Sequence, residues 1–579
     1  MEKRIKIGVY IILIVFAIFI LRLWQLQVIN GREYRELAEQ NRLRIVKIPA
    51  VRGIIYDRNG VPFVRNVPSF DISVIREYLP KDRETLSALS KLIGLSADEI
   101  QDRLRKAAVH PYEPVKLKIA VPWQEVARVE ARKADFPGLQ VDVEASREYI
   151  NGILASHIIG HLGRLTPEQS KNPDYKEVPR RALVGQLGIE MVYDKILRGT
   201  AGRKFIEVDA MGRKIKVVGV EEPVKGNDIT LTLDITLQKT AEEALKGKAG
   251  AVVALDPNTG EILALASSPA FDPNLFSRGI KPREWMKLLN NPQKPLLNRA
   301  LQSQHPPGST FKIITAIAGL EEGVITKNTE VNCTGVFTIG RRVFRCWKPS
   351  GRGTVSLHRA MVESCNIYFY EVGKRLGINK IAEYAKRFGL GKPVGLELLN
   401  EKSGIVPSIE WKLKTRKEQW FQGDTINVTI GQGYLSATPM QMALLMSIVA
   451  NGGKIYKPHL IKDSGVELVG NSKVNAENLA IVRKSLQGVV EEAEGTGGQA
   501  RSSLLRIGGK TGTTQVVGIR KPAHALPKKI RNHAWFVAFA PVENPQIALS
   551  VFVEHGGYGG VSAAPIAKKV IEAFYENDK

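Results

Sequence analysis

The segment HPPGSTFKIITAIAGL, residues 305–320, places a serine and a lysine three positions apart at the start of an apolar helix. Two prolines and a glycine precede Ser309 and interrupt any regular element there. From Phe311 onward apolar residues recur at helical spacing, so Ser309 is expected at a helix N-terminus with Lys312 one turn further on. Residues three apart share a helix face, so the hydroxyl and the amine can point into one site. A capping serine followed by a solvated lysine is the alternative that S-x-x-K alone leaves open.

Bulk composition indicates a multidomain, well-packed and strongly basic protein. The chain has 579 residues, of which 44% are hydrophobic, and a formal net charge of +25. This length predicts two or more domains, and the hydrophobic content supports real cores and argues against wholesale disorder. The positive charge suits nucleic acid, anionic lipid or an acidic polymer, without choosing among them.

The N-terminal segment predicts a membrane anchor. Residues 7–26 are almost entirely apolar, which is about the length that a bilayer core requires, and three cations at residues 3, 4 and 6 precede them. No small-residue cleavage site follows, so we expect an uncleaved single-pass anchor in the cytoplasmic (inner) membrane and not a signal peptide. Residues 1–6 would form a cytoplasmic tail, and everything after about residue 30 would lie outside the cytoplasm. That location disfavours ATP chemistry and nucleic-acid partners.

The rest of the chain divides into two predicted parts. Residues 31–225 form a mixed module without a cluster of catalytic side chains, which we interpret as a structural or interaction domain. Residues 228–579 carry predicted β-hairpins at both ends, 249–268 and 533–557, with helices between them. This pattern predicts an α/β (α+β) fold whose sheet is flanked by helices and whose first and last strands pair. Single helices are also predicted over 183–203 in the first part and over 357–376 and 378–388 in the second.

Three short motifs fall in order within the second part. Ser309 and Lys312 form an S-x-x-K, Ser364-Cys365-Asn366 an S-x-N within a predicted helix, and residues 510–513 a K-T-G-T beside the C-terminal hairpin. Each motif alone is weak evidence, but their order behind an export anchor is much more specific.

These motifs and several longer segments resemble the penicillin-recognising serine acyltransferases. The longer segments are RGIIYDRNG (52–60), GQLGIEMVYDKILRGTAG (185–202), LDPNTGEILALASSPAFDPN (255–274), NRALQSQHPPGSTFK (298–312) and GQGYLSATPMQMA (431–443). Over nearly its full length the chain resembles a monofunctional class B penicillin-binding protein of the cell-elongation, rod-shape type. The resemblance implies the penicillin-binding transpeptidase fold, with an antiparallel sheet, behind an elongated N-terminal pedestal of the dimerisation type. It also implies a peptidoglycan D,D-transpeptidase that β-lactams inhibit covalently.

The residues themselves suggest how such a serine would be activated. A serine hydroxyl needs a neighbouring base, and no Ser/His/Asp set presents itself. Lys312 can be that base only if its pKa is low, and burial together with a second cation, Lys510, would lower it. We therefore expect Lys312 to deprotonate Ser309, and Ser364 to relay the proton to the leaving amine. Asn366 would hold Lys312 and the substrate amide.

The K-T-G segment is expected to bind the substrate. Backbone N–H groups of Ser309 and Thr513 would stabilise the oxyanion, and Gly512 would let a substrate strand approach closely. Lys510, Thr511 and Thr513 would bind the terminal carboxylate of a stem peptide that ends in D-Ala-D-Ala. Attack of an amine on the acyl-enzyme gives a cross-link, whereas attack of water would make the protein a D,D-carboxypeptidase.

Three cysteines cluster in the sequence after the nucleophile. Three separate core thiols, a Cys333–Cys346 disulfide and a structural zinc site are the alternatives. This segment resembles that of the elongation-type penicillin-binding proteins, several of which carry metal-ligand types here, with a histidine in a G-H-G triplet that reads Gly351-Arg352-Gly353 in this chain. With Cys365, and with His358 as a fourth ligand, the set would be the Cys₃His that structural zinc favours. The chemistry itself requires no cofactor.

Other functions stay open at this level. A septal or sporulation-type class B transpeptidase, a β-lactam receptor of the same fold and a non-catalytic scaffold are the alternatives. The family implies a membrane glycosyltransferase and a rod-complex scaffold protein as partners, with peptidoglycan stem peptides as substrate.

Overall fold

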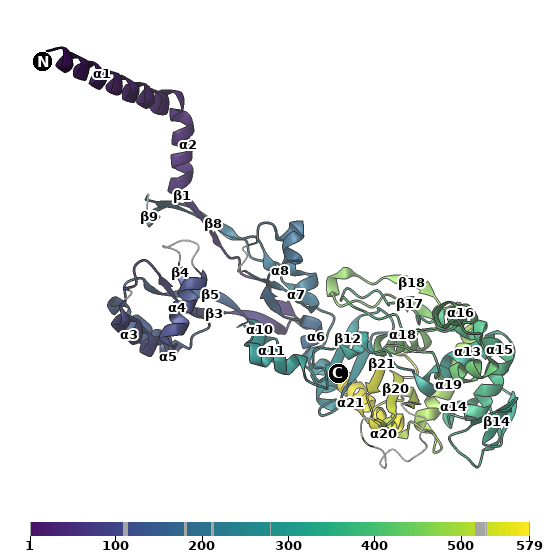
Figure 1. The fold of residues 1–579 in the computed structure, drawn as a ribbon. Helices are drawn as coiled ribbons and strands as arrows, with labels where there is room; N and C mark the ends of the chain where they lie inside the picture. Colours follow the sequence, from purple (N-terminus) through teal and green to yellow (C-terminus); the bar gives the residue numbers. More distant parts are fainter. Residues whose placement is uncertain are drawn as a thin grey trace.

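The chain is elongated, with its N-terminal helix projecting far from the catalytic end (Figure 1). The computed structural model describes residues 2–80, 82–107, 114–178, 182–209, 214–277, 279–515, 527 and 530–577. Helix α1 (Glu2–Trp24) continues through a π-helical turn (Gln25–Ile29) towards α2 (Gly31–Arg42). Residues Glu2–Ile29 are long and apolar enough to cross a membrane, and an 18-residue window within them has a mean hydropathy of 2.6 and no burial against the rest of the protein. The predicted anchor is thus one fully exposed apolar helix.

Two sheets form the scaffold of the N-terminal part. In the first, β1 (Leu43–Ile48) pairs with β8 (Gly202–Val208), which pairs with β9 (Lys214–Glu221). In the second the order is β10-β2-β3-β4, and β5 also pairs with β3. The strands of this second sheet are β2 (Ile55–Tyr56), β3 (Pro62–Ile75), β4 (Pro114–Lys118), β5 (Leu139–Tyr149) and β10 (Ile229–Thr230). The long strands β3 and β5 thereby connect the distal head to the catalytic end.

A small helical head packs on the far end of β3 and β5. Helices α3 (Arg83–Ile93), α4 (Ala97–Ala107) and α5 (Trp123–Ala131) enclose a separate apolar core with these strands. The Ser96 N–H donates to the Glu99 carboxylate at 3.0 Å, and the Glu99 N–H donates to Ser96 Oγ at 3.2 Å, so these two residues form a capping box at the start of α4.

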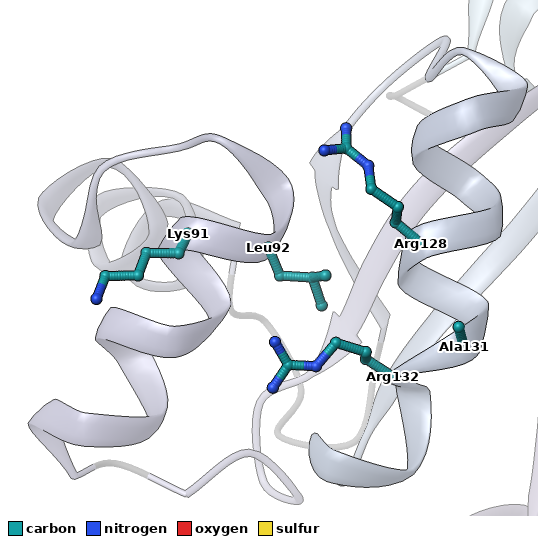
Figure 2. A pocket seen from close by; sticks show the side chains of 5 residues that line it. All are labelled: Lys91, Leu92, Arg128, Ala131 and Arg132. Carbon is teal, nitrogen blue, oxygen red and sulfur yellow. The ribbon is translucent and has the colours of Figure 1, made fainter.

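A cavity of about 370 Å³ lies between α3 and α5 of this head. It is lined by Lys91, Leu92, Arg128, Ala131 and Arg132. Figure 2 shows Leu92 and Arg132 pointing into the gap between the two helices, whereas Lys91 points away from it. No residue of the three motifs lines it, so this cavity is separate from the candidate active site.

The helix predicted over 183–203 is wrong. The segment forms β7 (Leu183–Gly185), α7 (Gly188–Val192) and α8 (Asp194–Arg198). Gly188 has φ +62°, and a Cβ there would lie 2.2 Å from the carbonyl oxygen of Ile158, so the chain must turn at this point. The break lets α7 and α8 present buried carboxylates to neighbouring strands.

Those carboxylates form a buried ion network. Arg52 Nε lies 2.6 Å from Glu190 Oε2, and Arg147 Nε lies 2.7 Å from Glu190 Oε1. Arg52 Nη1 also lies 2.8 Å from Asp194 Oδ1, and Asp194 accepts the Gly185 N–H at 2.8 Å. The network ties the segment just before β2 to residues about 140 positions later.

The catalytic part is built on a five-stranded antiparallel sheet in the order β12-β11-β21-β20-β19. Its strands are β11 (Gly250–Leu255), β12 (Ile262–Ser268), β19 (Gly508–Thr514), β20 (His533–Ala540) and β21 (Ile547–Val553). The pairing of β11 with β21 confirms that the first and last hairpins join into one sheet. Alternate residues of β20 enter two different cores, as the period of two requires.

Helices cover both faces of this sheet. Helices α9 (Ile235–Ala244) and α21 (Ala564–Asn577) pack in one core, and α13 (Lys312–Glu321) and α18 (Pro439–Ala450) in the other. The fold class predicted from the sequence is therefore confirmed. The remaining named elements are α6 (Ser156–Ile159), β6 (Leu162–Arg164), α10 (Asn274–Ser277), α11 (Pro282–Leu289), α12 (Arg299–Gln302), β13 (Glu330–Cys333), β14 (Val336–Ile339), β15 (Arg342–Arg345), β16 (Gly353–Ser356), α16 (Ile409–Arg416), α17 (Gln422–Thr429), β17 (Lys454–Tyr456), β18 (Leu468–Asn471), α19 (Ala476–Glu491) and α20 (Gly559–Ser562).

The continuous helix predicted over 357–376 is also wrong. Helix α14 (Leu357–Val362) ends before the S-x-N motif, and α15 (Asn366–Arg387) starts within it. Ser364 has φ +55°, a left-handed conformation that no helix interior accepts. The predicted separation near residue 377 is confirmed, because Gly377 has φ +73° and kinks α15.

Candidate active site

Ser309 lies where a 3₁₀ turn (Gly308–Phe311) leads into α13. This confirms the expected position at a helix N-terminus. Ser309 is half-buried, whereas Lys312, at the first position of α13, is fully buried. A solvated lysine is thereby excluded.

The Lys312 amine joins the first two motifs. Its Nζ donates to the Ser364 carbonyl at 2.9 Å and to Asn366 Oδ1 at 2.7 Å, and lies 3.2 Å from Ser364 Oγ. The left-handed turn at Ser364 aims both its carbonyl and its hydroxyl at this amine. The break between α14 and α15 therefore builds the site, although the helical prediction did not foresee it.

The K-T-G segment lies on β19, the last strand of the sheet order. Thr514 Oγ1 donates to the Pro306 carbonyl at 2.7 Å, which fixes this strand against the turn that carries Ser309. A Cβ at Gly512 would lie 2.7 Å from the Pro307 carbonyl, so only glycine permits this close approach. Among the residues that the structure describes, no strand pairs with the outer side of β19, so this edge is available to a peptide strand.

Lys510 and the two threonines of the segment lie close to this junction. Lys510 is fully buried, and its Nζ lies 3.4 Å from the Thr511 carbonyl. Thr513 Oγ1 accepts the N–H of Gly559 at 3.4 Å. The Lys312 ammonium lies close enough to Lys510 for its charge to lower the pKa of Lys510. The first and third motifs therefore meet, as the sequence predicted.

The pKa values of both lysines are lowered. Burial is the main cause for Lys312, whose pKa falls to about 8, and the Arg352 guanidinium adds to this, whereas Cys365 and Cys346 oppose it. Burial and then repulsion from Lys312 lower the pKa of Lys510 well below its usual value. Burial is thus the main cause of the lowered pKa of Lys312, and the cation that adds to it is Arg352, whereas the sequence had predicted Lys510.

The three cysteines form one buried cluster. The sulfur atoms of Cys333, Cys346 and Cys365 all lie within 4.8 Å of one another, and none forms a disulfide. Arg352 donates through Nη1 to Cys346 Sγ at 2.9 Å and through Nε to Glu363 at 2.8 Å. The arginine that replaces the expected histidine thus lies directly against the cluster.

His358 is not part of this cluster. Its ring nitrogens lie 3.3 Å from Ser485 Oγ and 2.7 Å from Glu492 Oε1. It is on α14, and its ring is directed to α19 and the loop that follows, so the predicted four-ligand set is corrected to three cysteines.

The side chains of Trp347 and Thr496 lie near the site and were not predicted from the sequence. The Trp347 indole donates to the Ser364 carbonyl at 3.2 Å, and Arg352 stacks on its ring with its Cζ 4.6 Å from the centroid. Thr496 Oγ1 lies 2.8 Å from Thr511 Oγ1. The position of Trp347 beside Cys346 was a usable signal, whereas nothing around Thr496 in the sequence indicates its place.

Two family models match the two parts of the chain. Residues 250–572 match the penicillin binding protein transpeptidase domain, and residues 47–231 match the penicillin-binding protein dimerisation domain. Among curated proteins, the chain is 36% identical to the peptidoglycan D,D-transpeptidase MrdA of Acinetobacter baumannii, over 99% of this chain and 88% of that protein. It is 30% identical to the stage V sporulation protein D of Bacillus subtilis, over 98% of this chain and 85% of that protein.

Solved structures agree with these matches. Penicillin-binding protein PBP2 of Helicobacter pylori, in complex with MreC, superposes with a TM-score of 0.83 at 30% identity, covering 92% of this chain and 99% of that one. A chain of a peptidoglycan synthase complex that coordinates polymerization and crosslinking gives a TM-score of 0.73 at 32% identity, covering 99% and 98%. With this full-length similarity, and with its three motifs assembled around Lys312, the chain belongs to the PBP2 (MrdA) family of class B penicillin-binding proteins.

Proposed function

We propose that this protein is a serine-type peptidoglycan D,D-transpeptidase that cross-links stem peptides during cell-wall elongation and shape maintenance. One observation carries the proposal: Lys312 is fully buried, bonded to Ser364 and Asn366, and one helical turn from Ser309. A buried amine with a lowered pKa is what a serine nucleophile needs as its base. The transpeptidase unit comprises residues 228–579, and residues 31–225 form its pedestal.

Acylation follows from this arrangement. Neutral Lys312 accepts the proton of Ser309, and Ser309 Oγ attacks the carbonyl carbon of the penultimate D-Ala. Backbone N–H groups of Ser309 and Thr513 stabilise the oxyanion. The proton on Lys312 passes through the Ser364 hydroxyl to the nitrogen of the departing D-Ala as the C–N bond breaks. An amine of a second stem then attacks the acyl carbon, and its proton passes through Lys312 to Ser309 Oγ as the ester C–O bond breaks, which restores the serine hydroxyl and neutral Lys312.

The substrate strand lies along the open edge of β19. Its ladder hydrogen bonds supply affinity, and Thr511 and Thr513 bind its terminal carboxylate. Lys510 becomes the charged partner of that carboxylate, because a bound anion raises the pKa that burial and Lys312 lower. Binding of the substrate carboxylate thereby favours the protonated, charged form of Lys510.

Mass spectrometry with a labelled penicillin tests this function. We expect one covalent adduct on the peptide that contains Ser309, and none in Ser309→Ala. An unchanged mass of the wild-type protein, or an adduct that persists in Ser309→Ala, contradicts it. With a peptide donor and an amine acceptor, cross-linked product identifies a transpeptidase, whereas release of D-Ala alone identifies a D,D-carboxypeptidase.

A non-catalytic scaffold of the same fold is the second candidate. The resemblance of the pedestal to a dimerisation domain favours an interaction role for that part. Complementation with Ser309→Ala separates the two, because normal growth and shape with the variant would favour the scaffold.

The membrane position and the partners are part of the same proposal. The exposed apolar helix Glu2–Ile29 supports a single-pass anchor in the inner membrane, with the transpeptidase domain outside the cytoplasm. A relative binds MreC, and another belongs to a complex that polymerizes and crosslinks peptidoglycan. By this likeness the protein would assemble with a rod-complex scaffold and a membrane glycosyltransferase.

The cysteine cluster would hold a structural zinc ion. Its sulfur atoms, all within 4.8 Å of one another, fit three corners of a tetrahedral site, and thiolates are ligands that zinc prefers. Bound there, zinc would brace the S-x-N turn through Cys365. Metal analysis of purified protein, with Cys333→Ser as the comparison, tests this: about one equivalent of zinc that the variant lacks supports it, and metal-free protein excludes it.

A further inference from the structure

In the segment that runs from Val331 in β13 to the end of α14, every charged side chain is positive. Residues 331–362 contain no aspartate or glutamate. Their lysines and arginines are Arg341, Arg342, Arg345, Lys348, Arg352 and Arg359. A long run of one sign in a folded domain has an electrostatic cost unless a partner of the other sign neutralises it.

Only part of this charge is neutralised within the protein. Arg352 Nε and Arg359 Nε lie 2.8 Å and 2.7 Å from the carboxylate oxygens of Glu363. The other four side chains, Arg341, Arg342, Arg345 and Lys348, are exposed, and we call them the hairpin cations. Among the residues that the structure describes, no carboxylate forms an ion pair with any of them.

The hairpin β14–β15 carries Arg341, Arg342 and Arg345, with Lys348 three residues after it, and is fixed to the S-x-N side of the site. The Arg345 carbonyl accepts Asn366 Nδ2 at 3.3 Å and the Tyr370 hydroxyl at 3.4 Å. Two residues later the Trp347 indole donates to the Ser364 carbonyl at 3.2 Å. These contacts hold the charges beside Asn366, the residue proposed to bind the substrate amide.

The hairpin also reaches the neighbouring helix. A Cβ at Gly423, at the start of α17, would lie 3.4 Å from Arg342 Nη1 and 3.3 Å from the Phe344 ring. The Arg342 guanidinium therefore extends from β15 across to α17. The hairpin that carries the three arginines is therefore held by contacts with α15 and α17 and does not project as a free loop.

We propose that the hairpin cations bind a side-chain or backbone carboxylate that the substrate peptide carries upstream of its D-Ala-D-Ala end. This inference rests on the proposed function, because it concerns the peptide that Ser309 acylates. Guanidinium groups match carboxylates in planar, two-bonded geometry, and unpaired cations at the rim of a cleft raise the local concentration of anions. The terminal carboxylate has its own partners on β19, so the hairpin serves a second, separate one.

The test compares two synthetic peptides that end in D-Ala-D-Ala and differ only by glutamate or glutamine upstream. The wild-type protein should favour the glutamate peptide in kcat/KM by about 3-fold to 10-fold at low salt, as expected for exposed ion pairs. The ratio should fall towards one in Arg342→Gln/Arg345→Gln and below one in Arg342→Glu/Arg345→Glu. High salt should also reduce the wild-type ratio, because it screens exposed charges.

A matched control neutralises exposed cations elsewhere. Arg283 and Lys287 are exposed on α11, which lies near the junction with the pedestal, whereas β14 is at the opposite end of the catalytic part (Figure 1). Arg283→Gln/Lys287→Gln should keep the wild-type ratio. A loss of preference equal to that of the hairpin variant would show a general charge effect and overturn the inference.

Penicillin labelling of Ser309 in the same samples separates the two claims. Labelled wild-type protein without preference for the glutamate peptide overturns this inference and leaves the proposed function intact. A preference that persists in the hairpin variants also overturns it. Absence of labelling in the wild type contradicts the proposed function itself.

Discussion

The lysines beside Ser309 and the arginines beside Glu190 are all buried, but they differ in the groups with which they interact. Arg52 and Arg147 share the carboxylates of Glu190 and Asp194 at 2.6–2.8 Å. Lys312 and Lys510 have only neutral oxygens within hydrogen-bonding distance, and no carboxylate pairs with either among the described residues.

This difference separates a structural cluster from a reactive one. In the pedestal, burial alone would raise the pKa of Glu190, but Arg147 and Arg52 lower it below its usual value. The charges therefore stay fixed, and the network holds the module together. Beside Ser309, burial outweighs the opposing effect of Cys365 and Cys346 and lowers the pKa of Lys312 to about 8, which makes the neutral amine available near physiological pH.

The largest effect should come from removing the unpaired lysine. Lys312→Met should reduce penicillin acylation of Ser309 by about 10²–10⁴-fold, because a positioned general base contributes that much. Acylation is measured by mass spectrometry over time.

Lys412 provides the matched control for this variant. It is also a buried lysine of the catalytic part, but its Nζ lies 2.7 Å from Asp424. Lys412→Met should lower the thermal stability and leave folded protein able to react. Equal acylation defects in the two variants would mean that burial of any lysine matters, and not the unpaired state of Lys312.

The next effect should come from breaking the compensated network. Glu190→Gln leaves two buried guanidinium groups short of a carboxylate and should lower the free energy of unfolding by about 3–5 kcal/mol. Denaturant unfolding followed by fluorescence measures it.

Removing one of those cations as well sharpens this test. The double variant Glu190→Gln/Arg147→Met should lose less free energy of unfolding than the sum of the losses of the two single variants, because the two side chains interact. Additive losses, or a Glu190→Gln protein as stable as the wild type, would contradict the account of the network.

A smaller effect is expected where pedestal and catalytic part meet. Glu242 on α9 accepts the Ala155 N–H and the Gln238 amide, both at 2.8 Å, and burial raises its pKa from 4.5 to about 7. Its folded pKa exceeds the unfolded value, so the stability that it contributes is full below pH 4.5 and is lost as pH rises through 7.

Thermal unfolding across pH measures this contribution. Wild type should lose about 1–3 kcal/mol relative to Glu242→Gln between pH 5 and pH 8. Parallel stability curves for the two proteins would show that this carboxyl group is ionised alike in the folded and unfolded states.

The sequence identified the catalytic side chains better than it identified the backbone that positions them. Ser309, Lys312 and Lys510 are found by motif, and the sheet follows from continuous apolar runs that flank predicted turns. The turn at Ser364 was missed, because its left-handed backbone is imposed by tertiary bonds from Lys312 and Trp347 to its carbonyl. Local propensity reports only neighbours in sequence.

The pedestal network was missed for the same reason. Arg52 and Glu190 are separated by 138 positions, and no sequence pattern around either residue predicts that they form an ion pair. His358 shows the reverse error: its spacing suited a zinc ligand, but the direction of α14 turns its ring towards Ser485 and Glu492. Spacing along the chain limits which residues can meet, whereas packing decides which of them do.

The pH dependence of Ser309 acylation by a penicillin tests the central claim most directly. Because only the neutral amine of Lys312 accepts the serine proton, the acylation rate should rise with pH through a single ionisation near 8. A rate that is constant from pH 6 to pH 9, or that falls as the lysine loses its proton, would contradict the role of Lys312 as the base.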